Sequence, residues 1–398
     1  MAKSRILFVD DEPRILEGLR RMLHKQRSRW DMQFISEPRE ALRVATETPF
    51  DVVISDMRMP AMTGAELLAE LRAHAPSTVR IILSGQAEMS SILKAIDPSH
   101  RFLSKPCDGA VLEQTVSSAI ALRSRVGNPA LVALVGGVEK PPTLPSIYAE
   151  LQEAIESGGS IQRIAEIIAR DIGMTAKLLK LMNSSYLGER RAVDSVIGAV
   201  ELIGIEALHL LVLEAKIFEP YTSDDAGSRQ ELQRIVLDAS NAAERACKLC
   251  KLTGMGPEAT RQSVLAAFLR EIGVLLLAQH APDLFGKALE QRASSPAPRA
   301  WTEHAAMGTT DGLTGAYLLG LWGFTSELVE AVAFHNRPSQ ATSRTLSPLT
   351  IVHIVDGIER VRNVSTHGDV DCGELFDMSY LREVGVGDRV SGWLDALL

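Results

Sequence analysis

Cysteine is scarce in this chain, which has four cysteines among 398 residues. So few thiols cannot form a disulfide framework, and we expect them to be free. No apolar run reaches the roughly 18 residues of a membrane span. Acidic residues directly after Ile6–Val9 also interrupt the run that a signal peptide would need. We therefore expect a cytoplasmic protein with no membrane partner.

Basic charge is in short supply after the first third of the chain. The formal net charge is −8; residues 1–124 carry 17 Lys and Arg against 16 Asp and Glu, which leaves 25 against 34, a net charge of −9, for the rest. Nucleic-acid binding depends on basic side chains that neutralise phosphates. The acidity therefore argues against DNA as a partner. It also disfavours a C-terminal part that binds a nucleotide or nucleic acid without chemistry.

Short apolar strands alternate with helical patterns five times in the first 124 residues. The strands are predicted at residues 5–9, 33–35, 52–54, 79–83 and 101–103. Apolar residues recur at helical spacing between them. This alternation predicts a doubly wound α/β fold with a five-stranded parallel sheet.

Carboxylates stand at the ends of two predicted strands. Asp10 and Asp11 follow the first strand, and Asp56 follows the buried run Val52–Ile54. In an open α/β sheet, ligands bind at the carboxyl ends of the strands. Three carboxylates in one place repel one another, and a hard divalent cation, most simply Mg²⁺, relieves the repulsion. We predict that Asp56 is the nucleophile that takes a phosphoryl group from a partner kinase.

The fourth and fifth strands end in groups that suit the same chemistry. Ser84 can donate a hydrogen bond to a phosphoryl oxygen, and the Lys105 ammonium can balance the charge of the transferred oxygens. Each residue alone has an ordinary explanation, since an Asp after a strand is often a helix cap and a Ser-Gly pair is often a turn. Their arrival at one sheet edge favours phosphoryl transfer.

These residues together resemble the response-regulator receiver family over about residues 4–124. The resemblance rests on Asp10-Asp11, Asp56 within the stretch 56–64, Ser84-Gly85 and Lys105-Pro106. It implies a flavodoxin-like fold and phosphorylation of Asp56 by a histidine kinase in a two-component phosphorelay. It also implies that Mg²⁺ is held by Asp11 directly, by Asp10 mainly through water, by Asp56 and by the backbone carbonyl of Arg58.

The same resemblance implies a switch. Ser84 moves toward the phosphoryl group and Phe102 rotates inward, while the face formed by the fourth helix, fifth strand and fifth helix repacks. It further implies a cis peptide bond between Lys105 and Pro106.

Helical periodicity dominates the chain beyond Pro145, and no alternation of strands appears there. Apolar residues recur at helical spacing between Ile147 and Met182, and further helices are predicted around 193–202, 205–219, 230–252, 258–280, 302–320, 325–336 and 347–361. An all-α bundle is therefore predicted. The expected limits are a receiver at 1–124, a linker at 125–140 in which a helix is left open, an all-α domain at 141–340 and a helical extension at 341–398.

The helical part resembles the HDOD family, a branch of the HD phosphohydrolase superfamily, over about residues 138–336. The stretches that carry the resemblance are Pro142–Pro145, Ile168–Leu179, Met182–Tyr186 and Ala199–Gly204. HD enzymes need an adjacent His and Asp and further histidines to hold metal. This chain has Arg270-Glu271 at that place, and Arg270 is a permanent cation that repels metal. His335-Asn336 stands where two histidines are expected.

We therefore expect the hydrolytic site to be lost, and the chain not to be an enzyme beyond its own phosphotransfer. The helical output would be a protein-interaction domain with an unknown downstream partner, and a homodimer is left open. The competing hypothesis is a receiver-controlled phosphodiesterase of cyclic dinucleotides. Its atypical metal site would be built from Glu271, Asp311 and His335.

Overall fold

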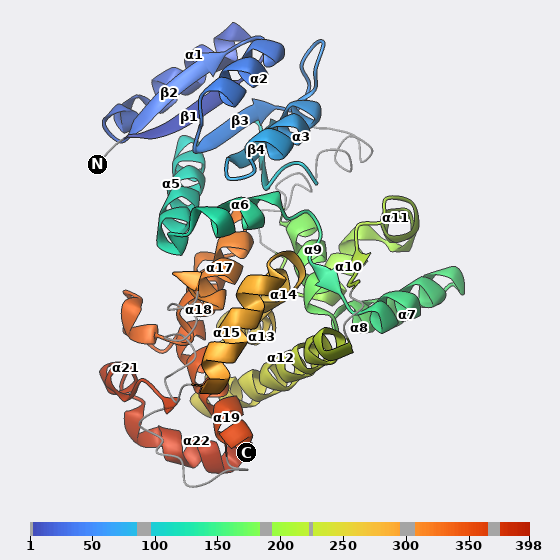
Figure 1. Cartoon of the computed structure of the whole chain (residues 1–398), viewed down its shortest axis with the longest axis vertical. Coiled ribbons are helices and arrows are strands. Elements are labelled where there is room, and N and C mark those ends of the chain that lie inside the picture. The colour runs from blue at the N-terminus through green and yellow to red at the C-terminus, as the bar shows by residue number, and fades with distance from the viewer. Residues whose placement is uncertain (1–2, 86–96, 184–192, 223–225, 295–306, 365–374) are drawn as a thin grey trace. The chain divides into compact units, whose positions relative to one another are not determined.

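The computed structural model of the chain describes residues 3–85, 97–183, 193–222, 226–294, 307–364 and 375–398. The chain divides into two compact units (Figure 1). The first is built mainly from Met1–Glu139, and the second mainly from the residues after Lys140.

A parallel five-stranded sheet with the order β2-β1-β3-β4-β5 forms the centre of the first unit. Its strands are β1 (Ser4–Val9), β2 (Trp30–Ile35), β3 (Val52–Asp56), β4 (Val79–Ser84) and β5 (Arg101–Ser104). Every residue of β3 and β4 is buried. This is typical of parallel strands that are covered on both faces, and it confirms the predicted α/β fold.

Helices pack around this sheet (Figure 1). They are α1 (Pro13–Met22), α2 (Pro38–Glu47), α3 (Gly64–His74) and α5 (Gly109–Val126). A capping box starts α3, because the Thr63 side chain accepts a hydrogen bond from the Glu66 N–H and the Glu66 carboxylate accepts one from Thr63 N–H. The expected fourth receiver helix belongs to the stretch between β4 and β5, where residues 86–96 lie outside the described residues.

A further helix follows α5 in the first unit. Gly127 ends α5 in the left-handed conformation, with a φ of 69°. Asn128 then caps α6 (Pro129–Gly137) by accepting hydrogen bonds from two backbone N–H groups. The linker at 125–140, for which the sequence left open whether it contains a helix, therefore contains α6.

The second unit is helical in its described parts, apart from one short strand pair. Its longer helices are α7 (Pro145–Glu156), α8 (Ile161–Ile168), α9 (Ile172–Met182), α10 (Val196–Ile203), α12 (Ala226–Thr253), α13 (Pro257–Leu269), α14 (Ile272–His280), α15 (Pro282–Ser294), α17 (Asp311–Leu321), α18 (Ser326–Phe334), α19 (Pro348–Val364) and α22 (Val390–Leu397). Shorter helical turns are α11 (Ile205–His209) and α21 (Met378–Glu383). The helical content confirms the predicted class of this region. Residues 184–186 of one predicted motif, and 302–306 of one predicted helix, lie outside the described residues.

Three local predictions differ from the structure. The helix expected at 205–219 consists of α11 and a π-helical turn at Leu210–Glu214. The chain then extends into β7 (Glu219–Pro220), which pairs in parallel with β6 (Pro142–Thr143). The helix expected at 258–280 breaks at Arg270-Glu271 into α13 and α14. Helix α15 was not predicted.

One helical stretch of the described residues, Pro257–His280, is long and apolar enough to cross a membrane by length and composition alone. It comprises α13 and α14, and 78% of its apolar window is buried inside the protein. The bent pair Val196–Ile203 and Ile205–Leu213 passes the same test when taken together. Burial of this kind is what a core helix of a helical bundle shows.

Candidate functional site

The sheet register brings the polar strand ends to one edge. Val9 lies opposite Ser55, Asp56 opposite Leu83, and Ser84 opposite Ser104. The residues that end or follow β1, β3, β4 and β5 therefore arrive side by side, as the sequence predicts. They are Asp10, Asp56, Ser84 and Lys105.

Lys105 joins two of the carboxylates at this edge. Its Nζ lies 2.6 Å from Asp10 Oδ2 and also donates to Asp56 Oδ1. Burial by itself would lower the pKa of Lys105, but the hydrogen bonds and charges of Asp10 and Asp56 outweigh it and raise that pKa. The ammonium is therefore charged at neutral pH and holds the two acids together.

Backbone N–H groups orient the same two carboxylates. The N–H of Arg58 donates to Asp56 Oδ2 at 2.6 Å, and the N–H of Glu12 donates to Asp10 Oδ1 at 3.0 Å. Asp10 is 2% exposed and Asp56 is 9% exposed. One carboxylate oxygen of Asp56 is thus held by the backbone directly after β3, and the side chain has little access to water.

The donor chemistry of this edge fits a hard divalent cation. Asp10, Asp11 and Asp56 offer only oxygen ligands, which Mg²⁺ prefers. As the side chains stand, Lys105 occupies the space between two of the acids. No group of three or more His, Cys, Asp or Glu side chains is assembled for a metal anywhere in the described residues.

The two expected switch residues, Ser84 and Phe102, lie in β4 and β5. Ser84 is 4% exposed and its hydroxyl donates to the Gly85 carbonyl oxygen at 3.1 Å. Phe102 is also buried. The Lys105–Pro106 peptide bond is cis, which confirms that expectation.

The loop after Asp56 contains two positions whose importance the sequence analysis missed. A Cβ at Gly64 would lie 2.0 Å from the Asp56 carbonyl oxygen, so only glycine fits there. Ala61 has a φ of 66°, a conformation that costs a residue with a Cβ roughly 1–2 kcal/mol. A lone glycine shortly after an acidic strand end was the available signal for the first; nothing local indicates the second.

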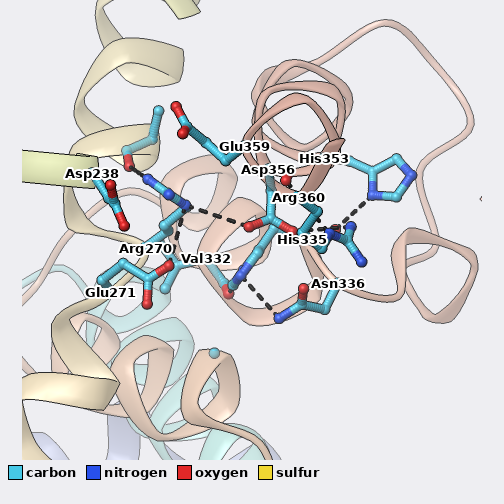
Figure 2. A network of polar contacts seen from close by, with 12 residues as sticks. Asp238, Arg270, Glu271, Val332, His335, Asn336, His353, Asp356, Glu359 and Arg360 are labelled. Carbon is cyan, nitrogen blue, oxygen red and sulfur yellow. Dashed lines mark hydrogen bonds and ion pairs between the residues drawn. The ribbon is translucent and has the colours of Figure 1, made fainter. Parts of the chain in front are cut away.

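A buried ion cluster occupies the place of the expected His-Asp pair in the second unit (Figure 2). Arg270 is 2% exposed, and its Nε lies 3.4 Å from Glu271 Oε1 and 3.6 Å from Asp356 Oδ1. Its Nη1 donates to the Ala267 carbonyl oxygen at 2.8 Å. The guanidinium therefore supplies positive charge inside the helical bundle, next to two buried carboxylates.

Helices α12 and α19 extend the cluster. Arg360 pairs with Asp356 at 3.0 Å, and Arg245 pairs with Glu359. Burial raises the pKa of Glu359, although the charge of Arg245 opposes this. The sequence placed the Arg270 cation at this position, whereas its contact with Asp356 of α19 has no signal in the sequence.

Two histidines beside the cluster use both ring nitrogens within the protein (Figure 2). His335 Nδ1 lies 2.8 Å from the Val332 carbonyl oxygen, and its Nε2 lies 3.0 Å from Asn336 Nδ2. His353 Nδ1 lies 2.7 Å from the His335 carbonyl oxygen, and its Nε2 accepts from the Asp377 N–H at 2.9 Å. These bonds make Nδ1 the protonated nitrogen in each ring.

Helices α14 and α17 are in close backbone contact. A Cβ at Gly273 of α14 would lie 2.0 Å from the Asp311 carbonyl oxygen of α17, and a Cβ at Gly315 would lie 2.9 Å from the Gly273 nitrogen. The two helices touch through glycine. Asp311 itself is buried and its Oδ1 accepts from the Gly312 N–H at 2.7 Å.

Family comparisons agree with both halves of this description. The response regulator receiver domain matches residues 6–117, and the HDOD domain matches residues 142–338. Two curated relatives are the hydrogenase transcriptional regulatory protein HoxA of Cupriavidus necator and the response regulator protein PilR of Pseudomonas aeruginosa. HoxA is 30% identical over 32% of this chain and 26% of its own length; PilR is 27% identical over 50% of this chain and 49% of its own length.

A solved receiver domain of an HD domain-containing protein from Pseudomonas fluorescens Pf-5 is 32% identical, covers 31% of this chain and 98% of its own chain, and has a TM-score of 0.29. The chain spans between about a quarter and a half of the length of the two curated relatives. The two family matches follow one another along the sequence and correspond to the α/β and helical regions. The chain therefore consists of a response regulator receiver domain followed by an HDOD domain.

Proposed function

We propose that Asp56 accepts a phosphoryl group from a histidine kinase and that this modification switches the HDOD domain. The observation that supports it best is the Lys105 ammonium, which contacts Asp56 and Asp10 at one sheet edge. A buried, charge-balanced carboxylate at the end of a parallel strand is suited to act as a nucleophile.

In the proposed reaction, an Asp56 carboxylate oxygen attacks the phosphorus of a phosphohistidine. The new O–P bond forms as the P–N bond breaks, and the imidazole leaves. Lys105 is placed to balance charge on the transferred oxygens, and the hydroxyl of Ser84 can turn from its present acceptor to donate to one of them. Mg²⁺ would be held by Asp10, Asp11, Asp56 and the carbonyl of Arg58, and would neutralise the phosphoryl group.

Labelling with a small phosphodonor tests this assignment. We expect the full chain to incorporate one phosphoryl group from acetyl phosphate in the presence of Mg²⁺, and to lose this when the metal is chelated. The Asp56→Ala variant should not be labelled, whereas an Asp31→Ala variant, which removes an exposed carboxylate of β2, should be labelled like the wild type. Equal labelling of the Asp56→Ala variant would refute the assignment.

We further propose that the HDOD domain has lost hydrolytic chemistry and acts as a protein-interaction output. Arg270 supplies a fixed cation to the buried acids, and Glu271 is engaged with it. Both ring nitrogens of His335 are hydrogen-bonded, to Val332 of α18 and to the following Asn336, and α14 and α17 are in close contact through glycine. These features count against the alternative metal site of Glu271, Asp311 and His335.

Two measurements decide between output and enzyme. The metal content of the purified full chain and its turnover of cyclic dinucleotides with added transition metals test the hydrolytic alternative, and turnover that disappears in a Glu271→Gln variant would overturn our proposal. Comparing the proteins captured by the phosphorylated and unphosphorylated chain tests the output role. A coupling of roughly 1–3 kcal/mol between phosphorylation and partner binding would be enough for regulation.

The domain limits of 1–124, 125–140, 141–340 and 341–398 and a cytoplasmic location are part of the same proposal. The start of α7 at Pro145 and the end of α5 at Val126 are consistent with the first two limits. A homodimer remains open to measurement by light scattering.

A further inference from the structure

Arg80 is an arginine in the interior of the receiver sheet. It lies in β4 and is 1% exposed. Its guanidinium donates to four backbone carbonyl oxygens, which belong to Gly136 (2.5 Å), Pro98 (2.7 Å), Thr78 (3.1 Å) and Pro76 (3.3 Å). Gly136 is part of α6, so this side chain ties α6 to the sheet.

His100, directly before β5, provides a second tie to the same carbonyl. Its Nδ1 accepts from the Arg80 N–H at 3.0 Å. A neutral imidazole carries one hydrogen, which must then be on Nε2, and Nε2 lies 2.9 Å from the Gly136 carbonyl oxygen. Burial, together with the charge of Arg80, holds the pKa of His100 well below its usual value. The ring therefore stays neutral at physiological pH and keeps both bonds.

The end of α6 approaches the receiver without space for a side chain. A Cβ at Gly136 would lie 2.1 Å from the Pro76 carbonyl oxygen. At the neighbouring Gly137, the nearest atom to a Cβ would be Pro76 Cβ at 3.9 Å, an ordinary contact. The last turn of α6 is thus fitted onto the receiver, whereas a free linker would need no such glycine.

We propose that β4 transmits phosphorylation from Ser84 to the end of α6. The inference rests on the proposed phosphorylation of Asp56. Ser84 and Arg80 are four residues apart in one strand, so their side chains share a face and are roughly 13 Å apart along it. When Ser84 is drawn toward a phosphoryl group on Asp56, β4 shifts with it, and the hold of Arg80 on the Gly136 carbonyl loosens.

Hydrogen exchange of the full chain tests the link, with Asp56 labelling measured on the same samples. Acetyl phosphate with Mg²⁺ should speed exchange of the backbone amides of residues 132–138 at least threefold in the wild type. The Gly137→Ala variant should behave in the same way, because its new Cβ has room. The Gly136→Ala variant should exchange quickly before phosphorylation and show no further change, although Asp56 is still labelled.

The outcomes separate this inference from the proposed function. A wild type that is fully labelled at Asp56 but shows equal or slower exchange in residues 132–138 would overturn the link and leave the proposed function intact. A Gly136→Ala variant that responds like the wild type would also overturn it. An unlabelled wild type would refute the proposed function and this inference with it. An Asp56→Ala variant given the same treatment should show no change.

Discussion

Acidification should destabilise the helical domain through His353. This ring is 1% exposed and is bonded on both sides, with Nδ1–H donating to His335 and Nε2 accepting from the Asp377 N–H. Burial lowers its pKa to about 4, and the nearby Arg360 charge adds to the effect, while the bond to His335 and the charges of Asp356 and Asp377 oppose it. A protonated ring would turn a second N–H toward the Asp377 N–H, which has no acceptor to offer.

Proton linkage gives the sign and the size of this change in folding stability. The unfolded chain binds a proton at His353 near pH 6.5, whereas the folded chain does so only near pH 4. The stability that this histidine contributes is therefore present above pH 6.5 and is lost as the pH falls through 4. The full difference is about 3 kcal/mol, of which about 2 kcal/mol is lost between pH 7 and pH 5.

The assay compares the wild type with a His353→Gln variant, which keeps one donor and one acceptor but does not titrate. Asp171 also titrates in this range, because burial raises its pKa to about 6. The stability that it contributes is present below pH 4 and is lost as the pH rises through 6. Both proteins contain Asp171, so the difference between them reports on His353 alone. In urea unfolding of the full chain, the wild type should lose about 2 kcal/mol relative to the variant between pH 7 and pH 5. Parallel pH profiles of the two proteins would refute the reasoning.

Three further substitutions test the two sites. Arg270→Met removes the buried cation that faces the carboxylates of Glu271 and Asp356 and should cost about 3–5 kcal/mol in urea unfolding; a loss below about 1 kcal/mol would contradict the ion cluster. Gly64→Ala pushes a Cβ into the Asp56 carbonyl and should slow labelling at least tenfold, while Gly18→Ala, with open space around it, should label normally. Ala61→Gly relieves a left-handed backbone and should stabilise the receiver by roughly 0.5–1 kcal/mol, so an unchanged urea midpoint would count against strain there.

The receiver fold could be predicted because its signals are local. Buried parallel strands appear as continuous apolar runs, and Val52–Ile54 is one of them. The candidate site could be predicted for the same reason, since its acids directly follow strands and the carboxyl ends of parallel strands meet. The link of Arg80 to Gly136 could not, because the two residues are 56 positions apart and an arginine in a short strand carries no sign of its partner.

The helical domain was predictable in class but not in detail. Helical periodicity continues through Arg270, so the break between α13 and α14 has no local signal. The helical stretch after Ile205 gives way to β7, whose pairing residues lie 77 positions away in β6, so its end could not be found locally. The contact of Asp356 of α19 with Arg270 could not be predicted either, because it is tertiary and the sequence around Asp356 shows only an amphipathic helix.

The glycine contact between α14 and α17 bears on whether metal-dependent hydrolysis could be engineered into the helical domain. An Arg270→His substitution would add one imidazole, but the backbones at Gly273 and Gly315 would still be in contact, with no space for a side chain between them. Side chains can be exchanged one at a time, whereas the separation of two helix axes depends on every residue between them. Making space between α14 and α17 would therefore require the two helices to move apart, which no single substitution achieves.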